Sequence, residues 1–190
     1  MTINDSLKKV WEFLKADTWQ SWIVSIILVI IIIKFIFFPF LSLVTGTKLP
    51  LVVVESCSMY HESDFDSWWS QNSAWYESHG INKSDFLSYK LKNGLNKGDI
   101  VIVLGSKNHS IGDIIIFSSE TRYPLIHRLI SLSPLATKGD NNPSQINGLE
   151  TDIAKEQVLG KAVGRIPALG WIKLIFFEFS KPKEQRGFCR

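Results

Sequence analysis

An almost uninterrupted apolar run, residues 22–44 (WIVSIILVIIIIKFIFFPFLSLV), constrains this 190-residue chain more than any other feature. About 20 such residues cross the hydrocarbon layer as a helix. A buried helix of a soluble domain would show a polar stripe at helical spacing, and Ile23–Ile33 shows none. Lys34 is the exception, and its long stem can reach the interface, so it is an anchor rather than a catalytic group. The sequence therefore predicts a transmembrane helix over residues 19–44.

The flanks of this run predict how the chain lies in a membrane. The run exceeds the apolar core of about 7–15 residues found in cleaved signal peptides, and no A-x-A-like site follows it, so we expect it to stay attached. Lys8, Lys9 and Lys15 precede the span, whereas only Lys48 follows it within residues 45–79. Positive residues favour the cytoplasmic side. We therefore expect a single-pass protein of the cell membrane, with residues 1–18 in the cytoplasm and the main domain outside.

The remaining length and composition allow one globular domain beside the span. The chain has 45% apolar and 21% charged residues, and its net charge of +3 is spread without a run of like charges. Nucleic-acid binding therefore has no electrostatic support. Cys57 and Cys189 are too few for a disulfide framework and lack the CxxC spacing that would hold zinc. The histidines show no HExxH spacing, and no metal or organic cofactor is implied.

Short β-branched runs bounded by Gly, Asn, Pro and Ser fill most of residues 48–165 and predict strands. These runs are LPLVVV (49–54), DIVIVL (99–104), DIIIFS (113–118), PLIHRLISL (124–132) and VLGKAVGR (158–165). No regular helices alternate with them, which favours an antiparallel sheet over a parallel one. We therefore expect a mainly β domain with an antiparallel, partly closed β-fold.

Residues 62–95 differ from the rest of this domain and predict a helical insert. A helix ending at the glycine stop Gly80 would place one set of side chains on a single face: Trp68, Trp69, Asn72, Trp75, Tyr76 and His79. Asn82 is placed to cap a second short helix that runs through Tyr89. The insert thus separates the first strand of the domain from the second.

The C-terminal residues 166–190 form an apolar segment and a basic tail. Residues 166–179 (IPALGWIKLIFFEF) are too short and interrupted to span a membrane, so we expect an interfacial or core-packed segment. Tryptophans flank the predicted span and recur in the insert and in this segment. Because indoles favour the membrane interface, both regions are predicted to dip toward the headgroups; ordinary packing of the indoles against the core is the equal alternative.

A serine, a histidine and a carboxylate in this chain could together activate a hydroxyl for acyl transfer. Ser58 follows the predicted strand 49–54, where a side chain can be presented at a sheet edge. Ser56 lies two residues earlier, so a continuing strand would place its hydroxyl on the same side, where it could donate to an oxyanion. Cys57 would then point away and serve as a packing residue. His127 lies in a strand-like run, and its neutral imidazole could accept the Ser58 proton near neutral pH.

Several boxes of the sequence, taken in order, resemble a known protease family. ESCSMYH (55–61) resembles the nucleophile box of type I signal peptidases, and GDIVIV, GDIIIF, IHRLI and TKGDNN follow in the order of that family's other boxes. The match covers most of residues 48–165. Because histidine rather than lysine occupies the base position 127, the chain is similar to the archaeal and endoplasmic-reticulum branch. A serine-lysine mechanism using Lys138 is therefore disfavoured.

The resemblance implies that Asp140, the aspartate of KGDNN, orients His127, while a turn-forming role for Asp140 is the alternative. The chain departs from the family pattern at three places. Where relatives carry a further aspartate, this chain has residues 145–146 (Gln-Ile). Asp152, which follows Glu150, is the next acidic alternative to Asp140 for the third triad position. The nucleophile box also has Cys57 for glycine and His61 for proline, so the turn is expected to differ.

The resemblance implies a membrane-bound serine endopeptidase that removes N-terminal signal peptides from exported preproteins. Its site would consist of Ser58, His127 and Asp140, with Ser56 as an oxyanion donor. The implied partners are signal-peptide-bearing preproteins with small side chains at the first and third positions before the cut, membrane lipid, and the secretion translocon as a further candidate. An alternative is a catalytically inactive, membrane-tethered β-domain that binds extended peptides or a membrane partner.

Overall fold

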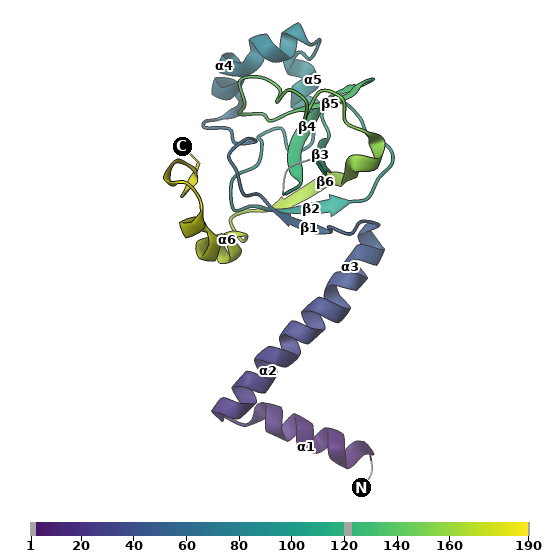
Figure 1. Cartoon of the computed structure of the whole chain (residues 1–190), viewed down its shortest axis with the longest axis vertical. Coiled ribbons are helices and arrows are strands. Elements are labelled where there is room, and N and C mark those ends of the chain that lie inside the picture. The colour runs from purple at the N-terminus through teal and green to yellow at the C-terminus, as the bar shows by residue number, and fades with distance from the viewer. Residues whose placement is uncertain (1–2, 120–122, 190) are drawn as a thin grey trace. The chain divides into compact units, whose positions relative to one another are not determined.

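The apolar run forms one long helix in the computed structural model, which describes residues 3–119 and 123–189. The chain separates into two units, Met1–Val44 and Thr45–Arg190 (Figure 1). The first unit begins with α1 (Ile3–Lys15), followed by α2 (Trp19–Ile32), a π-helical turn η1 (Ile33–Phe37) and α3 (Phe38–Thr45). Helical structure is continuous over Trp19–Thr45, which has 27 residues and contains an 18-residue window with a mean hydropathy of 3.0. This helix is long and apolar enough to cross a membrane.

The second unit is built on one six-stranded sheet in which every neighbouring pair is antiparallel. Its strands are β1 (Leu51–Val53), β2 (Ile100–Leu104), β3 (Ile114–Phe117), β4 (Leu125–Leu132), β5 (Leu135–Lys138) and β6 (Val158–Ile166). Their order is β1-β2-β6-β3-β4-β5, so the sheet is open, with β1 and β5 at its edges. The expected antiparallel sheet is confirmed.

All five runs that predicted strands contain one, whereas β5 was not predicted. It is only four residues long and lies between Pro134 and Gly139, which are turn signals rather than strand signals. It forms because the preceding residues turn back and allow antiparallel pairing with β4, with Arg128 opposite Lys138. Tertiary pairing thus overrides a weak local signal.

Two apolar clusters lie on the sheet and hold the strands that carry the site. One contains Met59 together with residues of the β2, β3 and β6 strands, and Met59 is only 1% exposed. The other joins Ile115, Phe117 and Leu129 to Leu135 and Ile153. Because Met59 is anchored in this core, the segment just before it is held close to the sheet.

The residues between β1 and β2 fold into α4 (Phe65–Ser78) and α5 (Lys83–Ser88). Asp64 caps α4, since its Oδ1 accepts hydrogen bonds from the backbone N–H groups of Asp66 and Ser67. Asn82 caps α5 in a reciprocal capping box with Asp85, and the cap predicted at Asn82 is confirmed. Figure 1 shows both helices at the β4–β5 end of the sheet.

The tryptophans of this insert pack inside the domain. Trp68 is 3% exposed and Trp69 is 5% exposed. They form a third apolar cluster with Tyr76, Ile81, Phe86, Ile130 and Ala136, of which the last two belong to β4 and β5. The prediction that these two indoles reach lipid headgroups is therefore wrong, and the alternative of ordinary core packing describes them.

The C-terminal residues follow β6 with α6 (Trp171–Phe177) and two 3-10 turns, η3 (Glu178–Ser180) and η4 (Lys183–Gln185); a further turn, η2 (Lys155–Gln157), precedes β6. In α6, Leu174 is fully buried, whereas Ile172 is 67% and Phe176 is 78% exposed. One side of the segment thus packs on the domain and the other presents apolar side chains to the outside. Its insertion into a membrane interface stays a prediction.

Candidate active site

Ser58 and His127 lie side by side although 69 residues separate them in the chain. Ser58 follows β1 in an irregular turn, and His127 lies in β4, opposite Ile115 of β3. The distance between Nε2 of His127 and Oγ of Ser58 is 2.9 Å. His127 is 2% exposed, while Ser58 is half-buried. A buried imidazole in contact with an accessible hydroxyl is the geometry that general-base activation of a serine requires.

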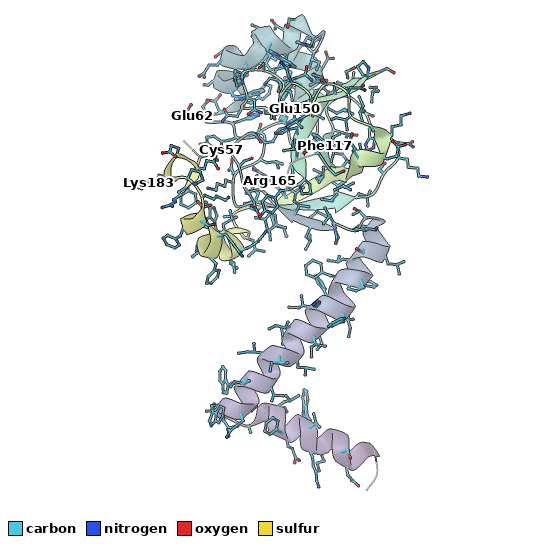
Figure 2. The ribbon with its side chains drawn as sticks, in the orientation of Figure 1. Cys57, Glu62, Phe117, Glu150, Arg165 and Lys183 are labelled. Carbon is cyan, nitrogen blue, oxygen red and sulfur yellow. A yellow bond between two sulfur atoms is a disulfide. The ribbon has the colours of Figure 1, made fainter. Side chains whose placement is uncertain are left out.

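The other ring nitrogen of His127 faces Glu150. Its Nδ1 lies 2.5 Å from Oε1 of Glu150. Glu150 is fully buried in the segment between β5 and β6 (Figure 2). Its other oxygen, Oε2, accepts a hydrogen bond from the backbone N–H of Ile146 at 2.6 Å. Ser58, His127 and Glu150 therefore contact one another in the order in which the nucleophile, the base and the carboxylate of a catalytic triad do.

Asp140, the carboxylate expected from the sequence to orient His127, has other partners. Its Oδ1 accepts hydrogen bonds from Tyr76 Oη at 3.0 Å and from Arg128 Nε at 2.9 Å. Its Oδ2 lies 2.6 Å from Arg128 Nη2 and 3.0 Å from His61 Nε2. Arg128 and His127 are consecutive in β4, so they project to opposite faces of the strand. Asp140 is therefore on the wrong side for His127, and this assignment is corrected to Glu150.

The environment of Asp140 is that of a structural ion pair. Burial alone would raise the pKa of this carboxyl group, but the charge and hydrogen bonds of Arg128, together with the hydrogen bond of His61, hold the pKa well below its usual range. The guanidinium of Arg128 is itself fully buried and lies 4.6 Å from the ring centroid of Phe86. This network attaches the segment after β5 to the helical insert. His61 and Tyr76, two of the partners of Asp140, come from segments distant from it in the sequence.

Ser56 occupies the position that the sequence suggested. Its Oγ lies 3.1 Å from Oγ of Ser58, and the Ser56 side chain is exposed. The turn is also tied to the loop after β5, because Asn141 donates its backbone N–H to Ser58 O at 2.8 Å and its Nδ2 to Cys57 O at 3.1 Å. The segment 55–58 is thus held from outside, without strand pairing of its own.

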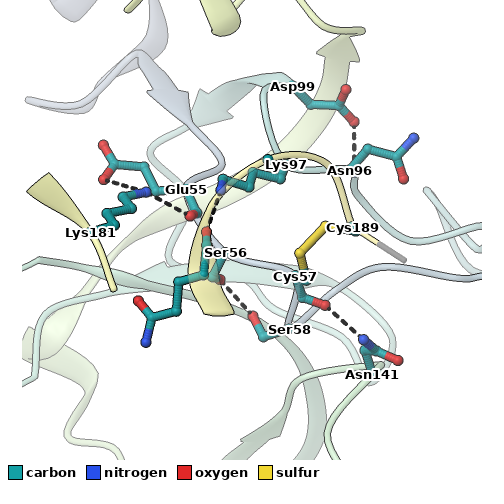
Figure 3. The surroundings of a disulfide bond; sticks show 12 residues. Glu55, Ser56, Cys57, Ser58, Asn96, Lys97, Asp99, Asn141, Lys181 and Cys189 are labelled. Atoms are coloured by element: carbon teal, nitrogen blue, oxygen red, sulfur yellow. Dashed lines mark hydrogen bonds and ion pairs between the residues drawn. A yellow bond between two sulfur atoms is a disulfide. The ribbon is translucent and has the colours of Figure 1, made fainter. Parts of the chain in front are cut away.

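Cys57 is joined to Cys189 by a disulfide bond (Figure 3). The two residues are 132 positions apart, and their Cα atoms are separated by 5.6 Å. The expectation that Cys57 is a packing residue is therefore corrected. Two cysteines with such a separation carry no local spacing pattern, so the sequence could not distinguish a bonded pair from two free thiols.

Lys138, the alternative base considered from the sequence, has its own partners. Its Nζ donates to the backbone carbonyl of Gly139 at 3.0 Å and lies 5.0 Å from the ring centroid of Trp75 and 4.9 Å from that of Tyr76. Burial lowers the pKa of Lys138 to about 8. Within the described residues, the hydroxyl of Ser58 has hydrogen bonds with Ser56 and His127. The arrangement thus favours histidine over Lys138 as the base.

No protein-family model matches the chain. The signal peptidase complex catalytic subunit SEC11C of Homo sapiens is 29% identical over 111 residues, which cover 51% of this chain and 58% of that protein. SEC11 of Debaryomyces hansenii is 28% identical over 109 residues, covering 48% of this chain and 64% of that protein. The sec11 subunit of Sclerotinia sclerotiorum is 26% identical over 106 residues, covering 48% and 62%.

The chain therefore spans about three fifths of the length of the curated relatives it matches. These relatives bear the name that the ordered boxes of the sequence suggested, and the shared region is accompanied by a Ser–His pair on an antiparallel sheet. The chain is thus similar in sequence to SEC11 catalytic subunits of signal peptidase complexes.

Proposed function

We propose that this chain is a membrane-anchored serine endopeptidase that removes signal peptides from exported preproteins. The observation that carries the proposal is the continuous contact from Ser58 Oγ through the His127 imidazole to the Glu150 carboxylate. A hydroxyl needs a base within hydrogen-bond reach and an oriented imidazole before it can attack a carbonyl carbon. The similarity to signal peptidase catalytic subunits supports a peptide bond as the bond that the proposed enzyme cleaves.

In each half of the proposed reaction, His127 first accepts a proton and then donates it. Ser58 Oγ attacks the scissile carbonyl carbon, and its proton passes to Nε2 of His127. The protonated imidazole, stabilised by Glu150, gives the proton to the leaving nitrogen, and the carbon–nitrogen bond breaks. Water then attacks the carbonyl carbon of the serine ester and loses a proton to His127. The carbon–oxygen bond to Ser58 breaks as His127 gives this proton to Oγ, which regenerates the hydroxyl, and the carboxylic acid product leaves. The Ser58 backbone amide and the Ser56 hydroxyl are the proposed donors to the oxyanion.

The location proposed for the enzyme follows from the rest of the chain. Residues 19–45 anchor it in the membrane as a single span, which confines enzyme and preprotein to one layer and raises their effective concentration. The Cys57–Cys189 disulfide supports a β-domain outside the cytoplasm, since such bonds persist in oxidising compartments. Proposed partners are preproteins with small residues before the cut, membrane lipid and the secretion translocon.

Cleavage by the purified full chain in detergent, with a signal-peptide-bearing preprotein as substrate, tests the proposal. We expect the wild type to cleave and Ser58→Ala to be inactive while retaining the wild-type melting temperature. Ser63→Ala is the matched control, because Ser63 is an exposed serine in the same region. Cleavage by Ser58→Ala at the wild-type rate would overturn the nucleophile assignment. A wild type that neither cleaves nor is labelled at Ser58 by a serine-directed acylating probe would instead support an inactive, tethered β-domain.

A further inference from the structure

The chain segment that follows α6 returns to the nucleophile turn. Here this segment, residues 178–189, is called the tail segment. Cys189 bonds covalently to Cys57, the residue between Ser56 and Ser58 (Figure 3). Lys181 Nζ donates to the backbone carbonyl of Glu55 at 3.0 Å. The tail segment therefore contacts two of the three residues that immediately precede the proposed nucleophile.

Buried polar contacts hold the tail segment on the domain. Lys97 is 3% exposed, and its Nζ donates to Glu178 Oε2 at 2.8 Å and to Gln185 O at 2.6 Å. The same Glu178 oxygen accepts the backbone N–H of Gly187 at 2.7 Å. A buried ammonium group whose hydrogen bonds are provided by the tail would be left uncompensated if the tail departed. The tail segment is thus built into the domain rather than loosely appended.

The nucleophile turn needs such support because it lies outside the sheet. β1 ends at Val53, and Val54 is the last residue before the turn to bond a neighbouring backbone carbonyl, that of Asp99. From the other side the turn is held by Asn141, through the carbonyls of Cys57 and Ser58. A segment without ladder pairing opens at low free-energy cost unless other contacts restrain it. Displacement of a reacting group by about 1 Å can cost about a hundredfold in rate.

We propose that the Cys57–Cys189 disulfide positions the nucleophile turn, so that Ser58 is held against His127 only when this pair is oxidised. The inference rests on the proposed peptidase function and adds Cys57 and Cys189 to it as positioning residues. The bond acts on the attacking hydroxyl rather than on the bound preprotein. Its loss is therefore expected to lower kcat and leave KM nearly unchanged.

The redox step is an ordinary thiol–disulfide exchange. A thiolate of dithiothreitol attacks one sulfur of the pair, and the sulfur–sulfur bond breaks to give a mixed disulfide with the reagent. The second thiol of the reagent then attacks the reagent's own sulfur in this mixed disulfide and releases the protein thiol. Two electrons and two protons end on the sulfurs of Cys57 and Cys189, and the reagent becomes a cyclic disulfide. A small-molecule disulfide such as oxidised glutathione accepts the electrons in the reverse reaction.

The experiment compares oxidised, dithiothreitol-reduced and reoxidised wild type with Cys189→Ser, all as the full chain in detergent. We expect reduction to lower kcat about tenfold or more, with KM changed less than about twofold, and reoxidation to restore it. Cys189→Ser should have the kcat of the reduced wild type, and dithiothreitol should not change it. Lys183→Ala is the matched control, since its side chain is exposed in the same tail segment (Figure 2), and it should keep wild-type kcat and redox sensitivity.

Amide hydrogen exchange provides a second measurement that does not depend on turnover. Reduction should speed exchange over residues 55–60 and leave β3 and β4 protected. Loss of protection throughout β3 and β4 would overturn the positioning role, because the bond would then support the whole domain. Unchanged kcat in protein whose reduction is confirmed by thiol alkylation would also overturn it.

Failure of this inference is distinguishable from failure of the proposed function. Cleavage that requires Ser58 but is insensitive to reduction rejects the positioning role alone. An oxidised protein without any cleavage that depends on Ser58 rejects the peptidase function and, with it, the catalytic role of the disulfide.

Discussion

Nδ1 of His127 lies 2.5 Å from Oε1 of Glu150, and this contact makes a glutamate rather than an aspartate the third member of the candidate triad. Both side chains are buried, so their interaction is weakly screened by solvent. The nearby Asp140 is engaged by Arg128 and has a structural environment. The two carboxylates thus differ in role, and substitutions at each should have different consequences.

Replacing Glu150 by glutamine should lower kcat by about 10²–10⁴-fold, because the amide cannot stabilise the imidazolium that forms when Ser58 attacks. The amide keeps only one acceptor oxygen, whereas Glu150 faces the backbone N–H of Ile146 with one oxygen and Thr137 Oγ1 and His127 Nδ1 with the other, so a moderate fall in melting temperature is expected. Steady-state cleavage of a preprotein measures the effect. Asp152→Asn is the matched control, since Asp152 is exposed, and it should retain wild-type kcat. An equal loss in Asp152→Asn would contradict the assignment of Glu150.

Replacing Asp140 by asparagine should lower the free energy of unfolding by about 3–5 kcal/mol, because it leaves the buried Arg128 guanidinium without its counter-charge. Chemical denaturation of the full chain in detergent measures this change. Arg128 is 0% exposed, so water cannot replace the lost partner. A variant as stable as the wild type would show that the ion pair is not the main contribution.

The lowered pKa of Asp140 also predicts that the free energy of unfolding falls at acid pH. The pKa of Asp140 is lower in the folded state than its ordinary value of 3.8, because the nearby guanidinium outweighs the effect of burial. The resulting stabilisation is complete above the unfolded-state pKa and is lost as the pH falls through the folded-state pKa. Wild-type stability should therefore decline below about pH 4, and Asp140→Asn should show a weaker decline. Parallel curves for the two proteins would refute this linkage.

Replacing Ser56 by alanine should lower kcat about tenfold to a thousandfold with little change in KM, because a donor to the developing oxyanion would be lost. Initial rates over a range of preprotein concentrations separate the two constants. Ser56→Thr keeps the hydroxyl and should recover part of the rate. If the alanine variant keeps full kcat, the contact between Ser56 and Ser58 has no part in the transition state.

Lys138 should destabilise the fold at neutral pH. Burial lowers its pKa from 10.5 to about 8. At a pH between these two pKa values, Lys138 is protonated in the unfolded chain and neutral in the folded chain. Its contribution to the free energy of unfolding therefore rises with pH. The rise should total about 3 kcal/mol between pH 8 and 10.5 and be absent in Lys138→Met. Denaturation curves at several pH values measure it, and an identical pH dependence in both proteins would contradict it.

Much of the fold could be predicted because its signals are local. The apolar run, the β-branched strands and the Asn82 cap each depend on residues close together in the sequence. Ser58 and His127 could be proposed because ordered boxes carried them. β5 escaped prediction because four residues between a proline and a glycine acquire their conformation from pairing with β4.

Glu150 and the disulfide could not be predicted for a related reason. Glu150 lies in an irregular segment, and no periodicity connects such a residue to a strand histidine. It reaches His127 because the Thr137 N–H donates to its backbone carbonyl and its N–H bonds to Ile146 O. These are contacts of the folded chain alone. Asp140 was expected because the family resemblance implied the aspartate of KGDNN, but the alternation of β4 turns its partner Arg128 away from the site.

The bond from residue 57 to residue 189 also orders events during biosynthesis. A ribosome completes the first cysteine of the pair long before the second, so nearly the whole β-domain emerges while the cross-link is still impossible. Under the proposed dependence on this bond, a nascent copy would stay inactive until the segment that carries Cys189 had been made. The proposed protease would thereby be prevented from cutting neighbouring chains at the same export site before its cross-link had formed.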